Sequence, residues 1–509
     1  MKAVALRVFV LLVITSLLQA NVTAQDGKSA ESSASTNEVD VLKRRVEELE
    51  RQNRIMMQTL AELKVKLGVT AISLAPAGLS NAQRSASDSP LDGTPIASQR
   101  ATANSPQRAL QTSTASQAAA GASVQTGANQ NKAKDDSVRW SELIGEGNRI
   151  KFYGLLRLDV DIDSQRPNNG QTPLFITSEA PGANNIETGS FSMHPRLTRF
   201  GIDYSGPRIA SLGDGALGGK LETDFENGGS ESRQIIRIRH AYLTLKWNQL
   251  TVLGGQTWDL VSPLFPTVNN DTLMWNAGNV GDRRPQFRVS YEPKAGQGQW
   301  SFAGAAGLMG AVDLQDLDAN GFRDGEESGR PNVQARIGYS HPLWVKDQRA
   351  SFGISGFYGW LNTSRSIAGR SNFHSQLINM DYTAPLAARL SLRGEGWWGR
   401  NLSDTRGGAG QGINLVTGQE IRSRGGWSEL ALKASRYWSI HPGFTMDDPV
   451  DRDLSAGSRT RNRAFYLGNR ITPGGNFLIG IDYLRWKTNF KGLQRGLDNR
   501  VNIFFQYGF

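Results

Sequence analysis

From about residue 149 to the end of the chain, apolar and polar side chains alternate with a period of two. This is the repeat of a β-strand that has one apolar and one polar face. In the first such segment, Leu156 and Leu158 share one face, whereas Arg157 and Asp159 share the other. Further copies of the pattern occupy 216–227, 284–292, 332–341 and 387–400. A sheet of this kind fits either a soluble β-sandwich or a barrel with lipid outside and water inside.

The last segment of the chain favours the barrel. Its apolar residues stand at every second position and end on an aromatic residue: Val501, Ile503, Phe505, Tyr507 and Phe509. This pattern resembles the terminal strand by which bacterial outer-membrane barrels are recognised for insertion. In a soluble protein such a strand would be an aggregation-prone edge, whereas in a closed barrel it pairs with the first strand. We therefore predict an all-β fold, a transmembrane antiparallel β-barrel over residues 140–509.

We predict about 16 strands, because barrels of this class have an even number and this number leaves an aqueous lumen. The expected strands lie near 149–163, 192–205, 216–227, 233–247, 249–260, 284–292, 299–309, 332–341, 349–361, 371–383, 387–400, 425–434, 437–446, 460–471, 475–489 and 499–509. The segment 437–446 is the least regular, since Pro442 lacks the N–H that a strand donates. Short turns are expected at the periplasmic side. The longer connections, expected outside, are 164–190, 261–283, 310–330, 401–424 and 447–459.

The chain before Trp140 has a different composition. Of the 43 aromatic residues, only Phe9 precedes this tryptophan. Residues 69–138 are rich in Ala, Ser, Gln, Thr and Gly and cannot bury enough apolar surface to offset the entropy of ordering. We predict a disordered tether there. The absence of cysteine from the chain excludes disulfides and thiolate sites.

An export signal is predicted at residues 1–24. A positively charged start precedes an apolar run over residues 8–18, and small residues follow at Ala20 and Ala24. Either alanine fits the cleavage position. The mature protein is expected to leave the cytoplasm.

Residues 35–68 are predicted to form a short α-helical coiled coil in the periplasm. Its core positions alternate spacings of three and four over four heptads: Val39, Leu42, Val46, Leu49, Asn53, Met56, Leu60, Leu63 and Leu67. Asn53 at a core position would fix the register, but it leaves open whether two or three helices associate. The alternative is a single amphipathic helix packed on the barrel.

Arginines on the polar strand faces are the candidate solute-binding groups. After residue 139, 33 of the 41 basic residues are arginine, whose planar guanidinium suits carboxylate or phosphate. We expect a cationic lining of the lumen made by Arg157, Arg199, Arg284, Arg288, Arg336, Arg389 and Arg393. The alternative is that these arginines pair with lumen acids and merely keep the wall solvated. Such acids would include Asp159, Asp203, Asp224 and Glu395.

Three features of the barrel leave alternatives open. Arg237 and Arg239 share parity with apolar neighbours, so either a bulge redirects them or they lie above the membrane band. The segment 262–281 either folds into the lumen and narrows it or forms an ordinary surface loop. Trp258 either contacts the lumen or belongs to the interfacial aromatic girdle.

The segment 310–330 contains a calcium-loop pattern, D-x-[DN]-x-[DN]-G-x5-E, without mismatch. The expected ligands are Asp316, Asp318, Asn320, the Phe322 carbonyl, Asp324 and Glu327, and Gly321 permits the sharp turn. Alternate residues converge on one centre, which makes the spacing informative. Hydrophilic acidic loops are also common on barrel exteriors, so an ordinary loop is the alternative.

Catalysis is not expected. The five histidines form no HExxH motif, and no G-x-S-x-G elbow is present. We expect no required cofactor, apart from possible Ca²⁺ in the 316–327 loop, and no nucleic-acid partner.

Short motifs follow one another along the barrel in a fixed order: Phe152-Tyr153-Gly154, Thr198-Arg199-Phe200-Gly201, Gly255-Gln256-Thr257-Trp258, Arg283-Arg284-Pro285-Gln286 and Arg461-Asn462-Arg463. They resemble the DcaP-like trimeric outer-membrane channels over nearly the whole barrel. The resemblance implies a sixteen-stranded barrel in a homotrimer, a three-stranded periplasmic coiled coil, and diffusion of small, often negatively charged organic acids. The long tether and Pro442 depart from the family pattern, and no substrate-binding set transfers.

We therefore expect an outer-membrane porin, surrounded by lipid, through which small anionic solutes of carboxylate type diffuse passively. One alternative is an envelope tether whose coiled coil contacts the cell wall, with the pore incidental. Another is a pore for neutral sugars, which predicts an aromatic ladder along the lumen. The inward aromatics Tyr153 and Trp397 are too few to show one.

Overall fold

The computed structural model describes residues 147–179, 189–226, 235–268 and 272–509. All of them belong to one of two compact units of the chain, Ala103–Phe509. The predicted signal (1–24), coiled coil (35–68) and tether (69–138) lie outside the described residues.

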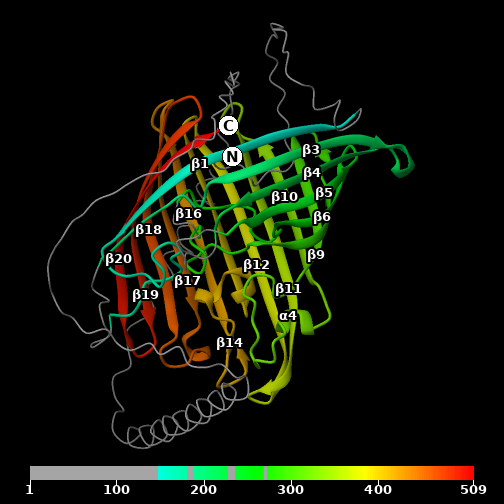
Figure 1. Cartoon of the computed structure of the whole chain (residues 1–509). Helices are drawn as coiled ribbons and strands as arrows, with labels where there is room; N and C mark the ends of the chain where they lie inside the picture. The colour runs from blue at the N-terminus through cyan, green and yellow to red at the C-terminus, as the bar shows by residue number, and fades with distance from the viewer. Residues whose placement is uncertain (1–146, 180–188, 227–234, 269–271) are drawn as a thin grey trace, which may run out of the picture. The chain divides into compact units, whose positions relative to one another are not determined.

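Sixteen antiparallel strands follow one another around a closed barrel, as predicted (Figure 1). They are β1 (Arg149–Asp163), β3 (Arg199–Ile209), β4 (Gly215–Asp224), β5 (Arg237–Lys246), β6 (Leu250–Trp258), β7 (Arg283–Tyr291), β9 (Gly298–Gly307), β10 (Asn332–Pro342), β11 (Arg349–Ile367), β12 (Arg370–Ala387), β13 (Leu390–Arg400), β16 (Arg422–Lys433), β17 (Trp438–Pro449), β18 (Arg459–Gly474), β19 (Phe477–Phe490) and β20 (Leu493–Gly508). Pairing of β1 with β20, for example Leu158 with Phe505, closes the ring. The aromatic last segment is therefore an internal strand of the wall without a free edge.

Short strands and helical turns lie in the connections between the wall strands. Strand β2 (Ser190–His194) pairs with the far half of β1, and β8 (Lys294–Ala295) lies in the turn before β9. The loop between β13 and β16 contains η3 (Ser403–Thr405), η4 (Gly408–Gly410) and the small hairpin of β14 (Ile413–Asn414) and β15 (Gln419–Glu420). The remaining helical turns are η2 (Ala210–Leu212), α4 (Asp324–Glu327) and η5 (Asp451–Asp453). None of the described helices is long or apolar enough to cross a membrane.

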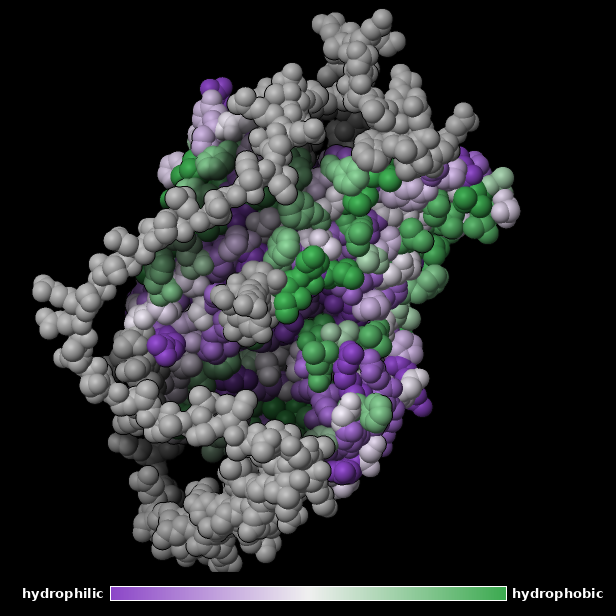
Figure 2. Space-filling model, in the orientation of Figure 1, coloured by the Kyte–Doolittle hydropathy of each residue, from purple (hydrophilic) through white to green (hydrophobic). Residues whose placement is uncertain are grey.

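The two faces of the wall separate as the period of two requires. On β1, Leu156 is 53% exposed, whereas Asp159 and Asp161 on the opposite face are each 1% exposed. In Figure 2, hydrophobic residues gather over strands toward the top of the view and hydrophilic residues around the lower loops. The outside of the wall is thus apolar and its inside polar, the arrangement that a lipid-spanning barrel needs.

Strand β17 is regular despite its proline. Pro442 pairs with Leu467 of β18, and the ladder toward β16 is interrupted only between Ile440 and Gly443. The missing N–H of the proline therefore falls in a gap of one ladder, and the strand is retained.

The apolar core lies inside the barrel, where loops pack on inward side chains of the wall. One cluster joins loop residues to β11, β12 and β13; it comprises Val261, Val280, Met309, Phe357, Leu361, Phe373, Leu377, Trp397, Leu402 and Ile413. A second joins loops to β18 and β19; it comprises Ile176, Val268, Met274, Ala277, Ala464, Tyr466, Leu484 and Trp486. Apolar residues at inward positions, such as Trp397, are the sequence signal for these buried loops.

Candidate functional site: the barrel lumen

The loop between β6 and β7, which the structure describes at residues 259–268 and 272–282, folds into the lumen. Its first half is anchored to the opposite wall, because the Leu264 N–H donates to Glu395 of β13 at 2.8 Å. The Thr267 N–H donates to Glu429 of β16 at 2.7 Å. Of the two alternatives for this segment, the inward fold is therefore correct.

The second half of the loop is held by other strands. The indole N–H of Trp397 donates to the Gly278 carbonyl at 2.7 Å, and the Asn462 amide of β18 donates to the Asn276 carbonyl at 2.8 Å. The described parts of the loop thus reach from β6 to β13, β16 and β18, and they narrow the space that the wall encloses.

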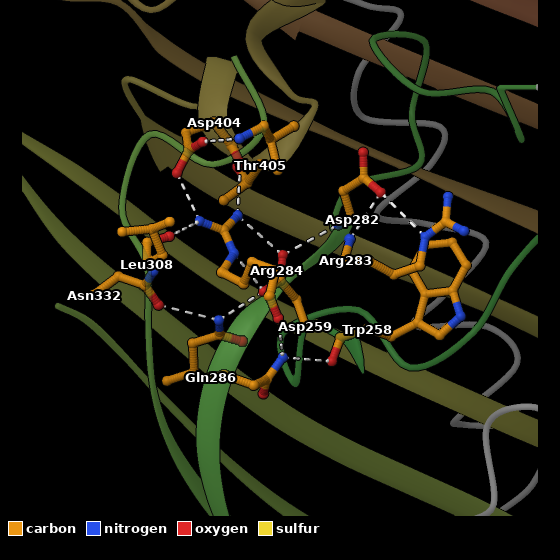
Figure 3. A network of polar contacts seen from close by, with 12 residues as sticks. Trp258, Asp259, Asp282, Arg283, Arg284, Gln286, Leu308, Asn332, Asp404 and Thr405 are labelled. Carbon is orange, nitrogen blue, oxygen red and sulfur yellow. Dashed lines mark hydrogen bonds and ion pairs between the residues drawn. The ribbon is translucent and has the colours of Figure 1, made fainter. Parts of the chain in front are cut away.

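Arg284 fastens this loop to the loop that follows β13 (Figure 3). Its guanidinium donates to Asp259 at 2.7 Å and to Asp404 at 2.6 Å, and the side chain is fully buried. Asp404 also accepts the N–H groups of Gly310 and Val312, at 3.0 and 2.9 Å. The expectation that Arg284 lines the open lumen is wrong, because two carboxylates and the overlying loops enclose it.

Four other predicted arginines face inward but have carboxylate partners. The pairs are Arg157 with Asp159 at 2.9 Å, Arg199 with Glu222 at 3.5 Å, Arg336 with Asp381 at 2.7 Å and Arg393 with Glu429 at 2.6 Å. For these residues, and for Arg284, the ion-pair alternative describes the structure. Arg288 and Arg389 form no ion pair with a carboxylate of the described residues. Arg288 donates to Gln286 and to the Trp258 carbonyl, and Arg389 lies exposed in the turn between β12 and β13.

The acids named in that alternative divide into two kinds. Asp159 and Asp224 pair with arginines, and Asp203 pairs with Lys220 at 2.7 Å. Glu395 instead accepts the hydroxyl of Ser262 and the Leu264 N–H, so it holds the inward loop rather than an arginine.

A bulge turns Arg239 inward. Glu222 of β4 pairs with His240 of β5, but the next residue, Thr223, pairs with Ile238, which leaves Arg239 as the extra residue. Arg239 contacts Glu222 at 2.7 Å and Asp224 at 2.8 Å, and Arg237 contacts Asp224 at 2.7 Å. The bulge is therefore the correct alternative, and it changes the parity of the strand at this point.

The open part of the lumen is a cavity of about 980 Å³ between the inward loop and the short-turn end of the barrel. Its described lining has eight cationic side chains: Arg288, Arg336, Arg349, Arg389, Arg393, Lys433, Arg436 and Arg470. Three carboxylates oppose them, and two of these already have partners, since Asp259 holds Arg284 and Asp381 holds Arg336. The third is Glu292. The cavity is therefore strongly cationic.

Half of this cationic lining was not predicted. Arg349 and Lys433 are the end residues of their strands and Arg436 lies in a turn, where a period of two assigns no side. Arg470 lies on the inward face of β18, and parity could have identified it. Trp258 and Phe265 also line the cavity, with ring centroids 4.5 Å apart. Trp258 is thus a lumen residue, not a residue of the outer girdle.

Charges also fix the end of the inward loop. Asp282 pairs with Arg406 at 2.9 Å and with Arg283 at 3.5 Å. Burial raises the pKa of Asp282, but Arg406 and Arg283 outweigh it and hold that pKa below its ordinary value. Asp282 is therefore an anion at neutral pH, and the loop is held closed by charge as well as by packing.

The predicted calcium loop lies between β9 and β10, at the long-loop end of the barrel, and its last four residues form α4. Asp316, Asp318 and Asp324 each bring a carboxylate oxygen to within 4.8 Å of the others. Glu327 lies close by, since its carboxylate accepts the Asn320 amide at 2.9 Å. Phe322 is exposed, and its N–H donates to the Asn320 side chain at 2.7 Å.

Comparison with solved structures identifies the fold. No protein-family model and no curated protein sequence matches the chain. The outer-membrane channel DcaP of Acinetobacter baumannii superposes with a TM-score of 0.57 at 17% sequence identity. The match covers 71% of this chain and 98% of DcaP. The barrel has the DcaP channel fold.

Two further solved structures resemble this chain more distantly. OmpT of Vibrio cholerae has a TM-score of 0.44 at 12% identity, covering 72% of this chain and 99% of its own. OprB of Pseudomonas putida has a TM-score of 0.44 at 10% identity, covering 72% and 96%. The superposition on DcaP confirms the DcaP-like barrel fold that the motif order predicted.

Proposed function

We propose that the protein is a passive outer-membrane channel for small organic anions, with carboxylates as the first solute class. The observation that carries this proposal is the lining of the cavity, which has eight cationic side chains and three carboxylates. No chemical step is needed, because an anion gains electrostatic attraction on entering and loses it on leaving.

The unpaired cations support an anionic solute more strongly than the total charge. Arg336, Arg393 and Arg470 have carboxylate partners, so their charges are largely compensated. The other five cations of the lining form no ion pair with the described residues: Arg288, Arg349, Arg389, Lys433 and Arg436. Arginine forks suit the two oxygens of a carboxylate. Trp258 and Phe265 offer an apolar surface on the loop side for the carbon skeleton of an organic acid.

The reversal potential across a planar bilayer under a salt gradient tests the proposal. We expect anion preference for the wild-type protein and a several-fold weaker preference for the double variant Arg288→Gln with Arg389→Gln. Arg208→Gln is the matched control, because Arg208 lies outside the cavity and pairs with Asp214 on the surface. Cation preference of the wild-type protein would overturn the proposal.

The neutral-sugar alternative gains little support. Four inward aromatic residues are covered by loops and offer no open ladder: Trp397, Trp486, Phe357 and Phe373. Competition of small carboxylates against neutral sugars in the same conductance experiment separates the two solute classes.

Assembly and envelope contacts belong to the same proposal. The resemblance to DcaP-like channels supports a homotrimer in the outer membrane, with residues 35–68 as a periplasmic coiled coil. Deleting residues 35–68 separates the channel from a tether to the cell wall. Normal conductance with altered envelope integrity would favour the tether role.

A further inference from the structure

The loop between β9 and β10 gathers negative charge without a cationic partner. Among the described residues, no basic side chain forms an ion pair with Asp316, Asp318, Asp324 or Glu327. The nearby Arg323 pairs instead with Glu326, at 3.4 Å. Several carboxylates that share one small volume repel each other, and a bound cation removes this repulsion.

Buried oxygen atoms without hydrogen-bond partners indicate where such a cation would bind. Asp318 is only 7% exposed; one of its carboxylate oxygens accepts the Arg365 N–H at 2.7 Å, and the other has no partner. One oxygen of Glu327 accepts the Ser364 hydroxyl at 2.7 Å, while its other buried oxygen has no partner. A buried carboxylate oxygen left without a partner is costly unless it coordinates an ion.

The backbone path agrees with the spacing of the motif. Gly321, the sixth residue of the pattern, has a φ of +90°, which favours glycine. Asp316 accepts the N–H groups of Asn320 and Gly321 at 3.0 and 2.9 Å, which folds the chain back over this carboxylate. Helix α4 contains both of the last two ligands of the pattern, at its first and last residues.

We propose that this loop binds one Ca²⁺ ion through the carboxylates of Asp316, Asp318, Asp324 and Glu327, with Asn320 and the Phe322 carbonyl completing the site. All donors are oxygen atoms, and the last Glu of this loop pattern coordinates through both carboxylate oxygens, which suits Ca²⁺ better than the rigid octahedron of Mg²⁺. An affinity of about 10⁻⁴ to 10⁻³ M suffices for extracellular calcium modules.

Bound calcium would fasten the loop to the wall. The backbone N–H of Arg365 and the hydroxyl of Ser364, both on β11, already contact Asp318 and Glu327. The ion would therefore join the loop between β9 and β10 to the protruding end of β11. This role is separate from anion passage, since the residues lie outside the cationic cavity.

Calorimetric titration of the full-length protein in a nonionic detergent, stripped with EDTA and titrated with CaCl₂, tests the site. We expect one Ca²⁺ per chain and at least tenfold weaker binding for Asp318→Asn and for Glu327→Gln. Glu326→Gln is the matched control, because Glu326 shares α4 but faces Arg323, and it should bind as the wild type does.

A second measurement does not depend on the variants. Calcium should slow cleavage by a Glu-specific protease at Glu326, which is partly exposed on α4. Heat-modifiable mobility in electrophoresis shows whether a variant is folded. If one of Asp318→Asn and Glu327→Gln is misfolded, the other is used for the comparison. Absence of calcium heat up to about 10 mM, beyond the range of extracellular modules, or equal binding by the wild type and both ligand variants, would overturn the proposal.

Discussion

Replacing Arg284 by methionine should release the loops inside the barrel while leaving the wall intact. The substitution removes the guanidinium contacts to Asp259 and Asp404, at 2.7 and 2.6 Å, but keeps much of the buried side-chain volume. It leaves two buried carboxylates without their cation. Loss of one partner of a buried ion pair costs about 3–5 kcal/mol.

The remaining contacts place the effect at the lower end of that range. Asp259 keeps the Gln334 amide at 2.7 Å, and Asp404 keeps the backbone N–H of Gly310 at 3.0 Å. These donors stabilise part of the uncompensated negative charge on the two buried carboxylates, so we expect a cost of about 3 kcal/mol. At 1.4 kcal/mol per tenfold, this free energy raises the population of the open loop about 100-fold.

Hydrogen exchange measures this opening directly. The N–H of Asn276 donates to the Arg406 carbonyl and that of Gly281 to the Thr405 carbonyl, both at 2.8 Å, so these amides report separation of the two loops. Both should exchange about 100-fold faster in Arg284→Met. Amides of the wall strands should be unchanged.

Two further variants test whether the loss of the Arg284 ion pairs causes the faster exchange. Arg237→Met should change exchange at these amides less than threefold, because Asp224 keeps Arg239 at 2.8 Å. Adding Asp404→Asn to Arg284→Met removes one uncompensated charge and should restore part of the protection. Protection of the loop amides within threefold of wild type in Arg284→Met, or no recovery in the double variant, would show that the Arg284 contacts to Asp259 and Asp404 do not hold the loops together.

Three more outcomes are expected. Glu395→Ala leaves the N–H of Leu264 without its acceptor, which costs about 1–3 kcal/mol of stability. The inward loop should loosen, and the single-channel conductance should rise. Glu395→Gln keeps an acceptor oxygen and should leave the conductance unchanged. Gly255→Ala should lower the midpoint of thermal unfolding by several degrees or prevent folding, because φ is +133° and a Cβ would meet the Ala241 carbonyl at 2.2 Å. Gly254→Ala, where a Cβ meets nothing within 4 Å, is its control, and equal unfolding of both would contradict the argument. Deleting residues 35–68 should leave the conductance of one barrel unchanged while shifting the oligomer to smaller species in native electrophoresis.

The sequence determined the wall of this barrel. The segment predicted at 149–163 is β1, Arg149–Asp163, and the last aromatic strand closes the ring against it. Both results follow from a local rule, since successive side chains of a strand face opposite sides and lipid selects the apolar side. The order of the short motifs likewise indicates the DcaP-type fold. Pro442 does interrupt the hydrogen bonding of its strand, as the sequence suggested, but only in the ladder between β16 and β17.

Tertiary structure decided what each inward residue does. Arg284 and Arg288 share one face of β7, yet the first is sealed between two carboxylates and the second lines the cavity. Asp404, which makes the difference, arrives from a loop 120 residues further along the chain. The bulge at Arg239 depends in the same way on the register between β4 and β5. Alternation determines only which side of the wall a side chain faces. Whether the charge of an inward side chain is accessible to a solute depends on which loops fold over that side chain.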